Sequence, residues 1–149
     1  MTAVPANAAF PTSRLLLVVA STAAALVVLW TVVKVGGLIS EDVYRGGVLG
    51  LLCATASNVV GTFAGSFFAA RMSAAAGKGD PLTSAYLAST TVRFIATPAL
   101  ALSLYFLLPQ KPTPLLLSAA AGHLLIMVAD IATLLRFVQG SARSSAPNA

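Results

Sequence analysis

The segment GGVLGLLCATASNVVGTFAGSFFAA, residues 46–70, decides the fold because it contains no charged side chain before Arg71. A transmembrane helix needs about 20 predominantly apolar residues to cross a hydrocarbon core of ~30 Å, and this segment is longer than that. A strand of a membrane β-barrel would need only about 10 residues of alternating apolar and polar character. The segment does not alternate, so it predicts a membrane-spanning α-helix.

Three further apolar runs have the same character. Together with the first segment they predict four transmembrane helices, at about 15–34, 46–70, 84–108 and 115–137. The composition agrees, since 58% of the residues are hydrophobic and only 9% are charged, against about 25% charged residues in soluble domains. We therefore expect an all-α, multi-pass integral membrane protein of the bacterial inner (cytoplasmic) membrane, surrounded by lipids. Residues 14–139 would form one four-helix domain.

The segments at the two ends of the chain are expected to lie outside this domain. Residues 1–13 are uncharged and contain two prolines, which is typical of a flexible leader, and residues 140–149 are expected to form a disordered tail. The first apolar run has an alternative interpretation as a cleaved signal peptide, because Arg14 precedes it and residues 23–25 are small. The run is long for a signal peptide, and no charge precedes Arg14, so the transmembrane helix is preferred.

The connections between the runs carry turn signals. Residues 41–45 follow two glycines and are expected to form a charged turn, while residues 77–81 and 109–114 are rich in Gly or Pro. Pro114 would open the fourth helix at its first position, where a missing backbone N–H costs nothing.

The orientation follows from the Lys and Arg residues near the helix ends, because the more basic side of a membrane protein usually faces the cytoplasm. One side carries five such residues, namely Arg14, Arg71, Lys78, Arg136 and Arg143. The other side carries three, namely Lys34, Arg45 and Lys111. The count predicts that both termini are cytoplasmic.

The net charge of +5 does not indicate a nucleic-acid partner, since the basic residues are scattered at the ends of the runs and form no patch. These residues can instead meet anionic lipid headgroups. Cys53 is the only cysteine, so it cannot form an internal disulfide, and a zinc site needs more ligands. We expect it to be a small residue of the core or of the lipid-exposed surface.

Two charged residues lie inside the predicted helices, Arg93 in the third and Asp130 in the fourth. An isolated Arg at this depth costs at least ~2.5–3.5 kcal/mol on the insertion scale. Asp130 lies at a similar depth, so an ion pair is geometrically easy. Three interpretations remain open: a gate or ion-pathway element, a buried pair that fixes helix register, and an Arg93 side chain that reaches the interface.

His123 lies two helical turns before Asp130 on the same face of the fourth helix. The two residues can line a proton or cation path, or His123 can be a neutral imidazole bonded to Ser or Asn of a neighbouring helix. Asn58, at mid-membrane in the second helix, needs a hydrogen-bond partner. It either holds helices together or provides a polar pore position.

Two features of the sequence concern helix packing. Gly61 and Gly65 form a GxxxG motif, which lets another backbone approach closely. Pro98 interrupts the third helix and is expected to kink it, or to be tolerated as prolines often are in membrane helices.

No motif indicates an enzyme. The chain has no Gly-rich phosphate loop, nucleophile elbow or cluster of metal-ligating residues, so we expect no catalytic residue, cofactor or metal.

Several local features occur together. They are RLLLVV at 14–19, YRGGVLG at 44–50, a small-residue helix that contains Asn58 and ends on FFAAR at 67–71, the buried basic Arg93, and a proline turn before the last helix. In this layout the chain resembles the ATP synthase protein I family over about residues 14–140. That family commonly has a Lys in the third helix, often preceded by an acidic residue. Here Arg93 takes the basic position, but Ser89 and Thr90 stand where the acid is expected, which puts acid-dependent ion binding in doubt.

The resemblance implies an accessory role in assembly or stability of the c-ring of the F-type ATP synthase, with c subunits as partners and cation supply as a further role. The residues alone leave two alternatives open. The protein can be a small homo-oligomeric ion channel or transporter, or a structural subunit of another membrane complex. A small multidrug exporter fits poorly, because the first helix has no embedded carboxylate.

Overall fold

Four long α-helices make up the computed structural model, which describes residues 11–74, 81–109 and 111–144. They are α1 (Thr12–Val35), α2 (Glu41–Ala74), α3 (Pro81–Leu107) and α4 (Pro112–Ser144). Each helix contains a stretch that is long and apolar enough to cross a membrane. The predicted all-α fold with four transmembrane helices is therefore confirmed, and the protein is a multi-pass membrane protein.

The expected charged turn at residues 41–45 is wrong, because these residues form the first turn of α2. Glu41 and Asp42 lie at the helix N-terminus, where acidic side chains offset the partial positive charge of the unpaired N–H groups. Arg45 Nε donates to Glu41 Oε1 at 2.9 Å, one turn along the helix, which supports the same conformation. The turn is confined to the residues before Glu41. There Gly37 has φ +72°, a left-handed conformation that favours glycine.

The predicted starts of the first and fourth helices are also wrong. α1 begins at Thr12, inside the expected leader, and residues 1–10 lie outside the described part of the chain. α4 begins at Pro112 rather than with Pro114 in first position, and both prolines are tolerated because first-turn N–H groups have no helical partner.

α4 also runs on to Ser144, into the expected disordered tail. Gly140 is unfavourable in a helix by only about 1 kcal/mol, Ala142 and Arg143 are good helix formers, and the next proline comes at Pro147, so the helix continues through residues 140–144. Residues 145–149 lie outside the described part of the chain, as do most of residues 77–81.

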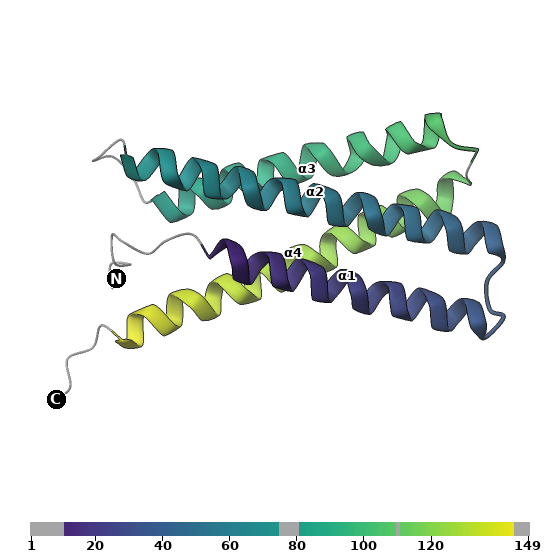
Figure 1. Ribbon diagram of the computed structural model, residues 1–149, viewed down its shortest axis with the longest axis horizontal. Helices are drawn as coiled ribbons and strands as arrows, with labels where there is room; N and C mark the ends of the chain where they lie inside the picture. Colours follow the sequence, from purple (N-terminus) through teal and green to yellow (C-terminus); the bar gives the residue numbers. More distant parts are fainter. Residues whose placement is uncertain (1–10, 75–80, 110, 145–149) are drawn as a thin grey trace.

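The helices pack around a central pair (Figure 1). α2 contacts the three other helices, α4 does the same, and α1 and α3 flank this pair without contacting each other. α2 and α3 lie alongside each other, while α4 runs obliquely across the bundle. The first residues of α1 and the last residues of α4 lie at the same end, so the described helices cross the membrane an even number of times.

The interior combines apolar side chains with polar ones, whereas the exterior carries many large apolar side chains. Large side chains such as Leu29, Phe63 and Ile95 are more than half exposed, as expected of surfaces that face lipid. The buried positions of α2 carry mostly small or polar side chains, including Ala54 and Ser57. Because lipid tails are as apolar as leucine, association of these helices depends on close packing and hydrogen bonds between them.

Candidate functional site

An ion pair between α3 and α4 lies at the centre of the buried polar groups. Arg93 and Asp130 are only 2% and 1% exposed, and Arg93 Nη1 donates a hydrogen bond to Asp130 Oδ2. Each residue therefore compensates a charge that would be costly to bury alone. The structure thus brings into contact the two charges that sequence placed at similar depths.

α2 supplies the second partner of the arginine. Thr62 Oγ1 accepts a hydrogen bond from Arg93 Nη2 at 2.7 Å, and the Thr62 hydroxyl donates to the carbonyl oxygen of Asn58 at 2.9 Å. Gly61 makes room for the arginine side chain. A Cβ at this position would overlap Arg93 Cγ and would lie 2.9 Å from the carbonyl oxygen of Ser89. Gly61 therefore allows both Arg93 and the α3 backbone to approach α2.

A second group of polar side chains surrounds His123 on α4. His123 Nδ1 lies 3.0 Å from Thr97 Oγ1 and 3.4 Å from Asn58 Nδ2. Asn58 Nδ2 also donates to the carbonyl oxygen of Ala54 at 2.7 Å, which fixes the orientation of the amide. The second amide hydrogen then faces His123 Nδ1. Whether Nδ1 donates to Thr97 or accepts from Asn58 depends on the tautomer of the imidazole.

The two groups are joined into one network. The Thr97 hydroxyl donates to the carbonyl oxygen of Arg93 at 2.9 Å, and Thr97 Oγ1 lies 2.6 Å from Ser57 Oγ. Asn58 connects to the ion pair through Thr62. We call this set the buried polar network; its members are Ser57, Asn58, Thr62, Arg93, Thr97, His123 and Asp130. It links α2, α3 and α4.

Some atoms of the network have no hydrogen-bond partner among the described residues. They include Asn58 Oδ1, His123 Nε2 and Asp130 Oδ1, all buried. A cavity of about 320 Å³ between α3 and α4 reaches the network, where Thr97 and His123 form part of an otherwise apolar lining. His123 therefore belongs both to the buried polar network and to the lining of this cavity.

The remaining predicted positions lie outside the buried polar network. Gly65 is buried on α2. Pro98 lies inside α3, which continues through it to Leu107, and the expected kink stays a prediction. Cys53 is buried in a small apolar cluster with Ala101 and Ala119, where α2, α3 and α4 meet.

Sequence reasoning did not single out three members of the network, Ser57, Thr62 and Thr97. A signal for Thr62 was present, because it follows Asn58 by four residues and so lies on the same face of α2. Ser57 is adjacent to Asn58 but bonds to α3 rather than to α4, which spacing alone does not reveal.

No protein-family model, curated protein or solved structure matches this chain. Within residues 11–74, 81–109 and 111–144, no three His, Cys, Asp or Glu residues lie close enough to hold a metal ion. The geometry shows a charge-compensated polar centre that joins three transmembrane helices, with a cavity whose lining includes two members of the network, Thr97 and His123.

Proposed function

We propose that this protein is an accessory protein of the bacterial inner membrane that assists assembly or stability of the F-type ATP synthase c-ring. In this proposal both termini are cytoplasmic, and the lipid-facing surfaces of the helices contact the partner. The resemblance to the ATP synthase protein I family supports the identity of the partner. The closed Arg93–Asp130 pair supports an accessory role rather than an independent transport activity.

The ion pair disfavours cation transport through this part of the bundle. The positive charge of the Arg93 guanidinium opposes the passage of a cation along this part of the bundle. Asp130 is already paired with it and is held between three helices. Such a centre stabilises one arrangement of the helices. The cation supply that the resemblance adds would then follow a route outside this pair.

The outer surface offers what a membrane partner needs. α1 has only two buried residues, Leu15 and Val19, and its exposed side chains include Leu17, Val28 and Val32. Membrane helices associate by packing such surfaces. The described part of the chain consists almost entirely of the four helices, so contact with a partner would occur mainly through them.

The experiment is affinity purification of the tagged protein from its native membrane in a mild detergent, with identification of the co-purified subunits. We expect the ring subunit of the ATP synthase, and less assembled ring when the protein is deleted. An untagged strain is the control. If the ring subunit is absent and ring assembly is unchanged in the deletion strain, the proposal is wrong. Recovery of subunits from another complex would instead support the structural-subunit alternative.

A second candidate, a small homo-oligomeric ion channel or transporter, is favoured by the cavity whose lining includes Thr97 and His123. It requires subunits to assemble, and it predicts ion flux in proteoliposomes. The Asp130→Asn variant should abolish this flux while it leaves the protein folded. Unchanged flux in that variant would rule out a pathway through Asp130.

A further inference from the structure

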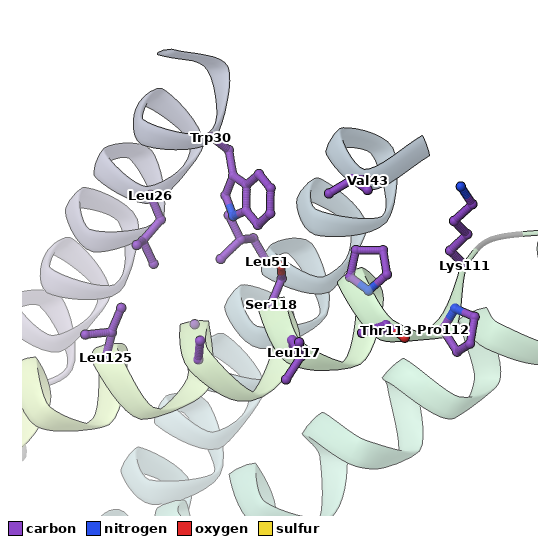
Figure 2. A pocket seen from close by; sticks show the side chains of 13 residues that line it. Leu26, Trp30, Val43, Leu51, Lys111, Pro112, Thr113, Leu117, Ser118 and Leu125 are labelled. Atoms are coloured by element: carbon purple, nitrogen blue, oxygen red, sulfur yellow. The ribbon is translucent and has the colours of Figure 1, made fainter. Parts of the chain in front are cut away.

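A cavity of about 650 Å³ lies away from the buried polar network, between α1, α2 and α4 (Figure 2). Its size falls within the ~300–1,000 Å³ that is typical of ligand pockets. Figure 2 shows Leu26 and Trp30 of α1 across from Leu117 and Leu125 of α4. We call this cavity the α1–α4 groove.

The groove exists because α4 has small residues where a large side chain would fill it. Ser118, Ala121 and Gly122 line it on the α4 side. On the opposite side the Trp30 ring packs over α2, where a Cβ on Gly47 would lie 2.9 Å from Trp30 Cζ2. The indole ring therefore forms a fixed wall of the groove.

One end of the groove carries an exposed ion pair. Lys111 lines the groove, and its Nζ lies 3.1 Å from Asp42 Oδ2, with both side chains mostly exposed. From Lys111 to Leu125 the groove follows α4 over roughly 20 Å at 1.5 Å per residue. This length resembles the ~15 Å of hydrocarbon in one leaflet, half of a core of ~30 Å. The groove thus runs from a charged membrane surface into the apolar interior.

We propose that the α1–α4 groove binds an acyl chain of a phosphatidylethanolamine molecule whose headgroup lies on the Lys111–Asp42 pair. The lipid phosphate would accept hydrogen bonds from Lys111 Nζ, and the primary ammonium of the headgroup would donate to the Asp42 carboxylate. An exposed ion pair contributes only about 0–1 kcal/mol, so it exchanges readily for these two contacts.

The charge of the pair selects this headgroup over the other common ones. The pair presents one positive and one negative group, which complement a zwitterion. An anionic phosphatidylglycerol headgroup would place negative charge beside Asp42. Phosphatidylcholine carries a quaternary ammonium, which has no N–H to donate to the carboxylate. The inference does not depend on the function proposed above.

Trp30 makes the test direct, because it is the only tryptophan in the chain and it lines the groove. The full-length protein would be reconstituted in phosphatidylcholine bilayers that contain increasing fractions of a dibrominated lipid, which quenches a tryptophan it touches. The lipids compared are phosphatidylethanolamine, phosphatidylglycerol and phosphatidylcholine with identical brominated chains. We expect a relative binding constant about fivefold higher for phosphatidylethanolamine than for phosphatidylcholine, as one interfacial charge contact supplies.

Matched variants separate the groove and its ion pair from general lipid contact. Ala121→Leu fills the groove and should abolish the preference, whereas Ala132→Leu, an exposed position elsewhere on α4, should retain it. Lys111→Gln removes a phosphate contact that the three lipids share, so it should leave their relative binding constants unchanged. Asp42→Asn should abolish the preference, because the carboxylate is the group that accepts from the primary ammonium. Arg45→Gln, which removes a basic side chain at the same end but outside the groove, should retain the preference.

The possible outcomes are distinct. Equal quenching by the three lipids, or a preference that Ala121→Leu leaves intact, would overturn the proposal. Stronger quenching by phosphatidylglycerol would overturn the assignment of a zwitterionic headgroup. If Ala121→Leu fails to fold, the comparison of lipids on the unaltered protein still decides the matter.

Discussion

At the scale of single residues, the Arg93–Asp130 pair places two opposite charges inside the membrane, where each compensates the other. Both side chains are almost completely buried, and Thr62 adds a neutral acceptor for the second Nη atom of the guanidinium. Removing one member of a buried pair leaves the other uncompensated, which usually costs more than removing both. The pair can therefore be tested by comparing single and double substitutions.

The first prediction concerns this coupling. Arg93→Leu and Asp130→Leu should each destabilise the folded protein by about 3–5 kcal/mol, because each leaves a buried charge or polar group without its partner. The double variant should lose clearly less than the sum of the two. Unfolding of the purified proteins in mixed micelles with increasing denaturing detergent measures these free energies. A double variant whose loss equals the sum would show that the pair is not coupled.

The second prediction isolates the threonine of the network. Thr62→Val keeps the side-chain shape but removes the acceptor of Arg93 Nη2, so it should cost about 1.5–3 kcal/mol, as expected for a hydrogen bond to a charged group. Thr55→Val is the matched control, because the Thr55 hydroxyl donates to the carbonyl oxygen of Leu51 in its own helix rather than to a neighbouring one. The same unfolding measurement applies. Equal losses in the two variants would argue against a special role for Thr62.

At the scale of helices, glycines set how closely α2 and α4 approach. A Cβ on Gly50 would overlap the carbonyl oxygen of Leu115 and would lie 2.8 Å from the Ala119 nitrogen, so backbone meets backbone there. At Gly122 the nearest atom is Leu51 Cδ2, at 2.8 Å, which is the end of a flexible side chain. The same added methyl group therefore meets a rigid obstacle at one site and a movable one at the other.

The third prediction follows from this difference. Gly50→Ala should destabilise the protein by about 1–3 kcal/mol or more, because the two helices must separate to relieve the overlap. Gly122→Ala should cost distinctly less, since Leu51 can change rotamer and alanine favours the helix by up to ~1 kcal/mol relative to glycine. Thermal unfolding of the two variants in the same detergent shows which of them is less stable. The reverse order would contradict the described approach of α4 to α2.

The helices also show what can be predicted from the residues alone. The four apolar runs were enough to predict the fold, and counting residues placed Arg93 and Asp130 at similar depths. The ends were misjudged where charged residues join a helix, as Glu41 and Asp42 do in α2. Contact of His123 with a Ser or Asn of a neighbouring helix was one of two interpretations. The residues alone could not select it, because the contact with Asn58 depends on how each helix is rotated. A run such as α2, with only a weakly amphipathic pattern, does not fix that rotation.

At the scale of the whole molecule, the arrangement of the helices divides the charged groups between two ends. The N-terminus of α1, the C-terminal ends of α2 and α4, and the start of α3 lie at one end, which carries Arg14, Arg71 and Arg136. The other end carries Lys34, Arg45 and Lys111. There Glu41 pairs with both Lys34, at 2.8 Å, and Arg45, at 2.9 Å. With Lys78 and Arg143, which the sequence assigns to the first end, the count there is five basic residues against three, and this supports the proposed cytoplasmic location of that end.

The fourth prediction tests this orientation in intact cells. In a Cys53→Ala background, single cysteines replace Ser13, at the start of α1, and Ser40, in the connection after it; both positions are exposed. A membrane-impermeant maleimide added outside the inner membrane should label the Ser40→Cys variant, while Ser13→Cys should react only after the membrane is disrupted. Because α1 spans between the two positions, the reverse pattern would mean that both termini face outward. In that case the basic residues would not set the topology, and the proposed cytoplasmic location of the termini would have to be abandoned.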